Sequence, residues 1–159
     1  MLRRISLVLI AVLWASAAAA AGFTLQDTQG KTHRLEDYKG KWVLVNFWAT
    51  WCPPCLEEMP DLIKLSETRK DLAVIGIAME YQDPQYVKEF ADNMFVTYPV
   101  VLGTREIAAQ IGKVPGLPTT YIYNPEGKLV ARNVGALTRQ AVERYIDTKT
   151  AAATLSAPK

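Results

Sequence analysis

The feature that most constrains this chain is the pentapeptide Trp51-Cys52-Pro53-Pro54-Cys55, which holds both cysteines among its 159 residues. It follows an apolar run, Trp42 to Trp48, that is typical of a strand buried on both faces of a sheet. Pro53 suits the first turn of a helix, where a missing N–H costs nothing, so the cysteines fall at a strand-to-helix junction. Two thiols at this spacing can close and reopen a small disulfide ring, and the context indicates a redox site.

Two other roles for the cysteine pair stay open at this point, a fixed local disulfide and half of a metal site. A structural zinc site needs four ligands, and the chain offers only these two sulfurs and His33. The composition therefore favours redox chemistry, with no resident metal and no cofactor beyond the disulfide itself.

The N-terminus has the pattern of an export signal. Met1-Leu2-Arg3-Arg4 is positively charged, the stretch from Ile5 to Ala15 is apolar, and small residues continue to Ala21. We expect residues 1–21 to be a signal peptide cleaved after Ala21, which places the domain in the periplasm, where disulfides form and persist. A retained anchor stays open, because residues 5–21 are nearly long enough to span a membrane if tilted.

The charge balance argues against a nucleic-acid partner. Removing the signal removes Arg3 and Arg4, so Lys plus Arg falls from 18 to 16 and equals the 16 Asp plus Glu. The mature domain is formally neutral, without the basic patch that nucleic-acid binding needs. We expect a monomer.

One domain, residues 22–150, is expected after the signal, followed by a small, polar tail over 151–159 that we expect to be disordered. Alternating strand and helix patterns predict an α/β fold around a central mixed sheet, with an N-terminal β-hairpin. The expected elements are a hairpin over 23–38, a strand over 42–48, a helix from 53 to about 69, a strand over 72–78, a helix from 84 to about 93, a short helix between Thr104 and Gly112, a hairpin over 119–133 and a last helix after Thr138.

Several ordered segments resemble the thioredoxin-like superfamily, specifically its exported TlpA/ResA-like branch. They are Val43 to Cys55, Glu58-Met59-Pro60, Gly116 to Thr120 and Pro125 to Lys128. The resemblance implies a thioredoxin-like fold and a thiol-disulfide oxidoreductase, acting mainly as a disulfide reductase. It also implies client proteins with disulfides or thiols, a membrane-borne dithiol donor, and work in cytochrome c maturation or metal-centre assembly.

The two cysteines are expected to divide the reaction. Cys52 lies where the helix begins, and the free N–H groups and partial positive charge of that end favour its thiolate. We therefore expect Cys52 to attack and Cys55 to resolve the mixed disulfide. Pro53 and Pro54 remove two N–H donors, which argues against a very low Cys52 pKa and hence against a strong oxidant.

Glu58 is the candidate proton acceptor. It follows Cys55 by three residues, about 60° around an ideal helix, whereas Glu57 lies about 160° away. An ordinary acidic residue early in a helix is the alternative. Asn46 stands where thioredoxin has a buried aspartate and cannot accept a proton at neutral pH, so proton handling is expected to pass to Glu58; a structural amide in a buried strand is the other interpretation of Asn46.

The resemblance also implies a client-binding rim. Leu117-Pro118 matches the cis-proline dipeptide beside the active disulfide, and the Leu117 backbone could pair with an extended client; a trans turn is the alternative. Trp51 is a candidate for the same rim, and Trp48 is expected in the core.

A Cu(I)-binding metallochaperone is the competing function. Soft thiolates suit Cu(I), and His33 could add a ligand. We expect His33 instead to be a surface residue, and copper chaperones on this fold usually space their cysteines further apart.

Overall fold

The computed structural model describes residues 22–156, so the expected signal peptide, residues 1–21, lies outside the described residues. The elements in chain order are β1 (Thr24–Gln26), β2 (Thr32–Arg34), η1 (Leu35–Tyr38), β3 (Trp42–Trp48), α1 (Pro53–Thr68), β4 (Leu72–Ala78), α2 (Pro84–Asn93), β5 (Val100–Leu102), α3 (Arg105–Ala109), β6 (Thr119–Tyr123), β7 (Leu129–Val134) and α4 (Arg139–Ser156).

A five-stranded mixed sheet of order β5-β4-β3-β6-β7 forms the centre of the molecule. β3 pairs with β4 in parallel and with β6 in antiparallel fashion, so it is the middle strand. All seven residues of β3 are buried, which confirms the prediction from its continuous apolar run. The C-terminal end of this buried strand leads to the cysteine pair, with Ala49 to Trp51 between them.

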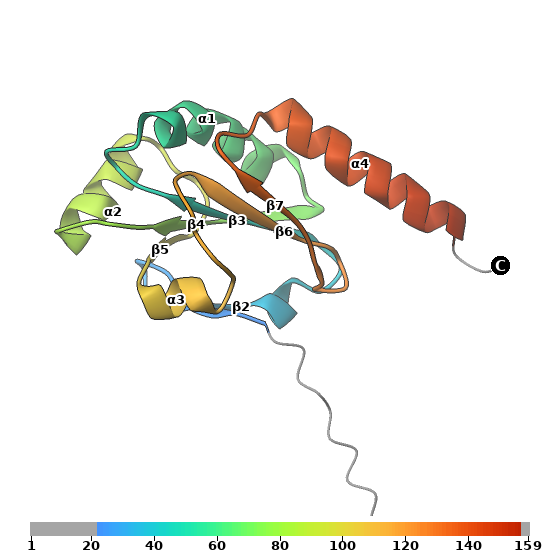
Figure 1. The fold of residues 1–159 in the computed structure, drawn as a ribbon, viewed down its shortest axis with the longest axis horizontal. Helices are drawn as coiled ribbons and strands as arrows, with labels where there is room; N and C mark the ends of the chain where they lie inside the picture. The colour runs from blue at the N-terminus through green and yellow to red at the C-terminus, as the bar shows by residue number, and fades with distance from the viewer. Residues whose placement is uncertain (1–21, 157–159) are drawn as a thin grey trace, which may run out of the picture.

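The two faces of the sheet are covered by different elements (Figure 1). Helices α1, α2 and α4 cover one face, while α3 and the antiparallel pair β1-β2 lie against the other. On the second face Phe23 and Leu25 pack against Phe47, Ile75 and Ile77. This expected hairpin therefore closes a core that the central sheet would otherwise leave exposed.

Side-chain caps define two of the predicted helix starts. The Asp83 carboxylate accepts a hydrogen bond from the Gln85 N–H at 2.9 Å, and the Thr104 hydroxyl accepts one from the Ile107 N–H at 3.2 Å. Each cap satisfies one of the backbone donors that a helix start leaves unpaired.

The structure differs from the sequence expectations in three places. β5 was not predicted, because three residues carry too little pattern; it forms by parallel pairing with β4. α3 ends at Ala109 rather than at Gly112. α4 continues to Ser156, beyond Ala151, where we expected disorder; the high helix propensity of alanine supports this continuation.

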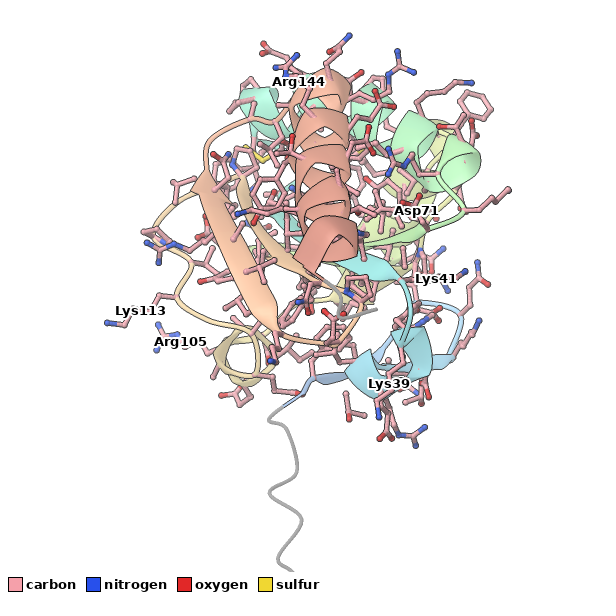
Figure 2. All side chains as sticks on the ribbon, turned by 90° about the vertical axis from the view of Figure 1, so that its right-hand side faces the viewer. Lys39, Lys41, Asp71, Arg105, Lys113 and Arg144 are labelled. Carbon is pink, nitrogen blue, oxygen red and sulfur yellow. A yellow bond between two sulfur atoms is a disulfide. The ribbon has the colours of Figure 1, made fainter. Side chains whose placement is uncertain are left out.

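Charged side chains project from many sides of the domain. Figure 2 shows Lys39, Lys113 and Arg144 at well-separated positions on its outline. Among the helices of residues 22–156, none is both long enough and apolar enough to cross a bilayer.

Candidate active site

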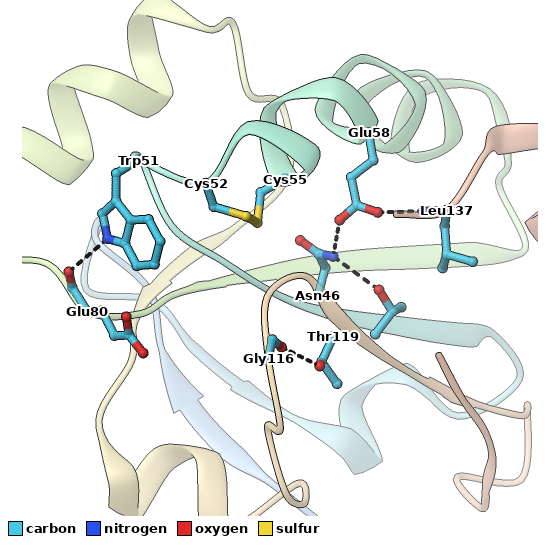
Figure 3. The surroundings of a disulfide bond; sticks show 10 residues. Asn46, Trp51, Cys52, Cys55, Glu58, Glu80, Gly116, Thr119 and Leu137 are labelled. Carbon is cyan, nitrogen blue, oxygen red and sulfur yellow. Dashed lines mark hydrogen bonds between the residues drawn. A yellow bond between two sulfur atoms is a disulfide. The ribbon is translucent and has the colours of Figure 1, made fainter. Parts of the chain in front are cut away.

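The cysteine pair forms a disulfide at the start of α1 (Figure 3). Cys52 is the N-cap residue, and its carbonyl oxygen accepts hydrogen bonds from the N–H groups of Cys55 at 3.0 Å and Leu56 at 3.2 Å. The Cα atoms of Cys52 and Cys55 are 5.3 Å apart. The predicted position of both cysteines at the junction between strand and helix is therefore confirmed.

Few backbone donors are free to stabilise a thiolate on Cys52. Pro53 and Pro54 occupy the first two helical positions and have no N–H, and the Cys55 N–H already bonds the Cys52 carbonyl. The partial positive charge of the helix start remains. The extent to which Cys52 forms a thiolate remains a prediction.

Glu58 lies on the inner face of α1 and is only 2 % exposed, while Glu57 is exposed. One oxygen of the Glu58 carboxyl accepts a hydrogen bond from the Asn46 side-chain amide at 2.6 Å, and the other accepts one from the Leu137 N–H at 2.7 Å (Figure 3). The predicted difference between the two glutamates in helix face is thus confirmed. The role of Glu58 in proton transfer remains a prediction.

Burial raises the pKa of Glu58 from its ordinary value of 4.5 to about 7, although the hydrogen bonds from Leu137 and Asn46 act in the opposite direction. Both donors are neutral, so no positive charge offsets the loss of water around the carboxylate. A carboxyl group with this pKa can accept and release a proton near neutral pH.

Asn46 on β3 has the structural role that was one of its two interpretations from the sequence. It is buried, it donates to Glu58, and its amide nitrogen also lies 3.1 Å from the Thr120 hydroxyl oxygen on β6. It is thus a hydrogen-bonded structural amide, and the group that it holds is the candidate proton acceptor.

The loop before α4 supplies contacts that the sequence did not predict. The Leu137 N–H binds Glu58, and the Arg139 N–H donates to the Asp61 carboxylate at 2.8 Å. Two carboxylates one turn apart on α1 therefore satisfy backbone donors at the start of α4. No sequence signal identifies these partners, because they are 79 and 78 residues apart along the chain.

The Leu117–Pro118 peptide bond is cis, as the resemblance implied. Pro118 is buried, and Leu117 packs against the apolar cluster that contains both cysteines. The Pro118 carbonyl accepts a hydrogen bond from the Gly135 N–H at 2.9 Å. This dipeptide therefore borders the disulfide; its contact with a client remains a prediction.

The two tryptophans have the expected environments. Trp48 is fully buried and packs near Phe90 of α2. Trp51 is 59 % exposed, and its indole N–H donates to the Glu80 carbonyl at 3.3 Å, which fixes the ring beside the disulfide.

The expectation that His33 is a surface residue is wrong. Its side chain is 2 % exposed, and its two ring nitrogens contact the Asp27 carboxylate at 2.8 Å and the Tyr38 hydroxyl at 2.5 Å. β2 brings His33 into the core between the hairpin and η1, so both nitrogens are engaged away from the cysteines. Within residues 22–156, no three His, Cys, Asp or Glu side chains gather in a way that could hold a metal ion.

The sequence pattern of the AhpC/TSA family matches residues 17–132. This chain belongs to that family. It is 34 % identical over 134 residues to the thiol-disulfide oxidoreductase ResA of Geobacillus kaustophilus (strain HTA426), covering 84 % of this chain and 77 % of the relative. The chain is a thiol-disulfide oxidoreductase of this thioredoxin-like family.

Solved structures of related proteins share the fold of this oxidoreductase. A thiol:disulfide interchange protein of the thioredoxin family from Chlorobium tepidum TLS aligns with a TM-score of 0.72 at 30 % identity, over 80 % of this chain and 92 % of that chain. The exposed lipoprotein thioredoxin Etrx1 from Streptococcus pneumoniae strain TIGR4 aligns with a TM-score of 0.71 at 29 % identity, over 80 % and 98 %. The predicted thioredoxin-like fold is confirmed.

Proposed function

We propose that this oxidoreductase reduces disulfides of exported proteins in the periplasm, with Cys52 as nucleophile, Cys55 as resolving thiol and Glu58 as proton acceptor. The observation that carries the proposal is the disulfide at the start of α1 beside a buried carboxyl group whose pKa is about 7. Membership of the family implies client proteins that carry disulfides. The periplasmic location, the reducing direction and the roles of the three residues belong to the proposal.

In the first step, the Cys52 thiolate attacks one sulfur of a client disulfide. A Cys52–client disulfide forms, the client disulfide breaks, and the released client sulfur takes up a proton from solvent. In the second step, Cys55 gives its proton to the Glu58 carboxylate and attacks the Cys52 sulfur. The Cys52–Cys55 disulfide forms, the Cys52–client bond breaks, and the second client sulfur leaves as a thiolate that takes up a proton from solvent, so the client gains two electrons and the enzyme loses two.

The local donors support the reducing direction. A strong oxidant needs a highly stabilised thiolate, with a pKa near ~3.5, whereas thioredoxin-like reductants lie near ~7. Pro53 and Pro54 withhold two N–H groups from the Cys52 sulfur, so we expect a reduction potential nearer about −270 mV than about −120 mV. Such a pair needs recharging in an oxidising compartment, and we propose a membrane-borne dithiol as the electron donor.

Export and client class are part of the same proposal. The export pattern over residues 1–21 supports a periplasmic location, and the Streptococcus relative is described as an exposed lipoprotein. We propose clients whose cysteines must be reduced before they bind haem or a metal, as in cytochrome c maturation or metal-centre assembly. Trp51, Leu117 and Pro118 border the disulfide and supply the rim on which a client segment would lie.

Redox titration of the purified protein against glutathione or dithiothreitol tests the direction of electron flow. We expect a potential well below −200 mV, within the reductant range. A value more positive than about −170 mV would instead indicate a disulfide oxidase. Trapping with Cys55→Ser, which should stall the Cys52–client disulfide, identifies the clients.

A further inference from the structure

Two polar atoms in the buried layer under α1 have no protein partner. Among the side chains of the residues that the structure describes, only the Trp48 indole N–H and the Tyr98 hydroxyl are buried without a hydrogen bond. Trp48 is 0 % exposed and Tyr98 is 5 % exposed. Buried polar groups are rarely left unpaired, so two such groups in one domain require an explanation.

Gly76 on β4 brings these two groups together. A Cβ atom on Gly76 would lie 2.9 Å from Cε2 of Tyr98 and 3.0 Å from Nε1 of Trp48. Both side chains therefore occupy the space over a residue that has no side chain of its own. The unpaired donors converge on one small region of the sheet face rather than lying in separate parts of the core.

The same region lies next to Asn46, which holds the carboxyl group of Glu58. Gly76 is the register partner of Asn46 on the neighbouring strand, and paired residues of parallel strands present their side chains to the same face. Asn46 in turn holds Glu58. Tyr98 also packs with Leu62 and Leu65, which continue the stripe of α1 that Glu58 begins.

We propose that Tyr98 and Trp48 form a buried polar site behind Glu58 that binds one water molecule and links it to the Glu58 carboxyl group. A buried water needs two to four polar partners, and the Tyr98 hydroxyl, the Trp48 N–H and a carboxyl lone pair supply three. Tyr98 is then a positioning residue for the redox reaction. The link to Cys55 rests on the proposed role of Glu58, but the binding of water does not.

The hydrogen-bonding chemistry of this site suits a carboxyl group that changes its protonation state. A tyrosine hydroxyl both donates and accepts, and water does the same, whereas the Trp48 N–H only donates. Burial and the nearby Glu58 carboxylate raise the pKa of Tyr98 far above neutrality, so its proton stays on the phenol. Tyr98 and the water can therefore donate to ionised Glu58 and adapt when Glu58 is protonated.

Among the groups near Glu58 that come from elements other than α1, Tyr98 is the main titratable one. β3 contributes the neutral Asn46 amide, and the loop before α4 contributes the Leu137 N–H. On α1 itself, the cysteine pair precedes Glu58, and the Asp61 carboxylate is occupied by the Arg139 N–H. Loss of the Tyr98 hydroxyl should thus act on Glu58 without a compensating charge.

The test uses the oxidised full chain carrying ¹³C-labelled glutamate carboxyls, with the Glu58 signal assigned by its loss in Glu58→Gln. Tyr98→Phe should raise the midpoint of Glu58 titration by about one pH unit, because a donor to the ionised form is lost. Tyr121→Phe is the matched control: it removes a hydroxyl that donates to the Lys113 carbonyl in the opposite core, and the midpoint should stay unchanged.

A second measurement needs no variant of Tyr98. The wild-type Trp48 indole proton should show a magnetisation-transfer cross-peak to a long-lived water. Gly76→Ala should remove this cross-peak, because the added methyl group would collide with the Tyr98 ring and the Trp48 indole and displace both from the water site. An unchanged Glu58 midpoint in Tyr98→Phe, or a Trp48 proton without a water contact in the wild type, overturns the proposal.

These outcomes are separable from those of the proposed function. If Glu58→Gln retains full turnover while Tyr98→Phe shifts the Glu58 midpoint, the catalytic role of Glu58 fails and the water site stands. If Glu58→Gln slows turnover and Tyr98→Phe leaves the midpoint unchanged, the water site fails and the proposed function stands.

Discussion

Two buried polar clusters lie on opposite sides of the central sheet, and the pKa values of their acids are shifted in opposite directions. The Glu58 cluster, defined by Glu58 and Asn46, lies under α1. The His33 cluster, defined by His33, Asp27 and Tyr38, lies between the N-terminal hairpin and η1. Burial raises the pKa of the acid in both clusters, but only the pKa of Glu58 remains raised.

The difference lies in the number and kind of donors. Burial by itself would raise the pKa of Asp27, but hydrogen bonds from His33 and from the backbone N–H groups of Lys31 and Gln29 bring it below its usual range. Glu58 receives one hydrogen bond from a neutral amide and one from a backbone N–H, which do not offset its burial. A fully partnered cluster stabilises a fold, whereas an under-compensated carboxyl group remains free to exchange a proton.

The largest expected effect is the loss of reductase activity when a cysteine beside the Glu58 cluster is replaced. Cys52→Ser, next to the Glu58 cluster, should abolish insulin reduction, because the attacking sulfur is lost. Cys55→Ser should also stop turnover, but it should accumulate disulfides between Cys52 and clients. Near wild-type turnover by Cys52→Ser would refute the assignment of the nucleophile.

The second effect is a pH dependence of stability. The pKa of Glu58 in the folded protein is above its ordinary value. Glu58 therefore adds fully to the free energy of unfolding below about pH 4.5, and this contribution is lost as the pH rises through about 7. The pKa difference corresponds to roughly 3 kcal/mol. We expect urea unfolding to show falling stability across this range, and Glu58→Gln to flatten the profile.

Asp27 should give the opposite sign in the same titration. The pKa of Asp27 in the folded protein is lowered. Asp27 therefore adds to the free energy of unfolding at pH values above its ordinary pKa of 3.8, and this contribution is lost as the pH falls below that value. Asp27→Asn should therefore change the acid limb of the curve and leave the limb between pH 4.5 and 7 in place. If both variants altered the same limb, the contrast between the clusters would be wrong.

A third prediction concerns the resolving step. Glu58→Gln should slow the release of client from the Cys52–client disulfide by about a hundredfold, as expected for the loss of a general base, and should remove the inflection near pH 7. Stopped-flow tryptophan fluorescence at several pH values measures both. Glu57→Gln is the control, since that side chain is exposed on the other face of α1; equal effects from both would contradict the helix-face argument.

The smallest expected effect on activity comes from the His33 cluster. His33→Ala should cost about 2 kcal/mol of stability, because Asp27 and Tyr38 lose their buried partner. Turnover per folded molecule should stay at the wild-type level, as should Cu(I) affinity of the reduced protein. A selective loss of turnover or of Cu(I) binding would show that this cluster is more than structural.

The sequence by itself determined the elements that carry local signals. The apolar run of β3, the prolines at the start of α1 and the spacing of Glu58 from Cys55 are short-range patterns, and the structure reproduces all three. They follow from the burial of a strand on both faces, backbone chemistry and helix periodicity, which act within a few residues.

Only the tertiary structure decided what surrounds those elements. The partner of Glu58 at Leu137 and the position of Tyr98 over Gly76 depend on segments far apart along the chain. The burial of His33 depends on how the hairpin folds onto η1, although its partners Asp27 and Tyr38 are only six and five residues away. His33 has the same local pattern whether it faces solvent or the core, because a short hairpin exposes one face until another element covers it. Local sequence patterns therefore predicted which groups react, and long-range packing determined the environment and hence the pKa of Glu58.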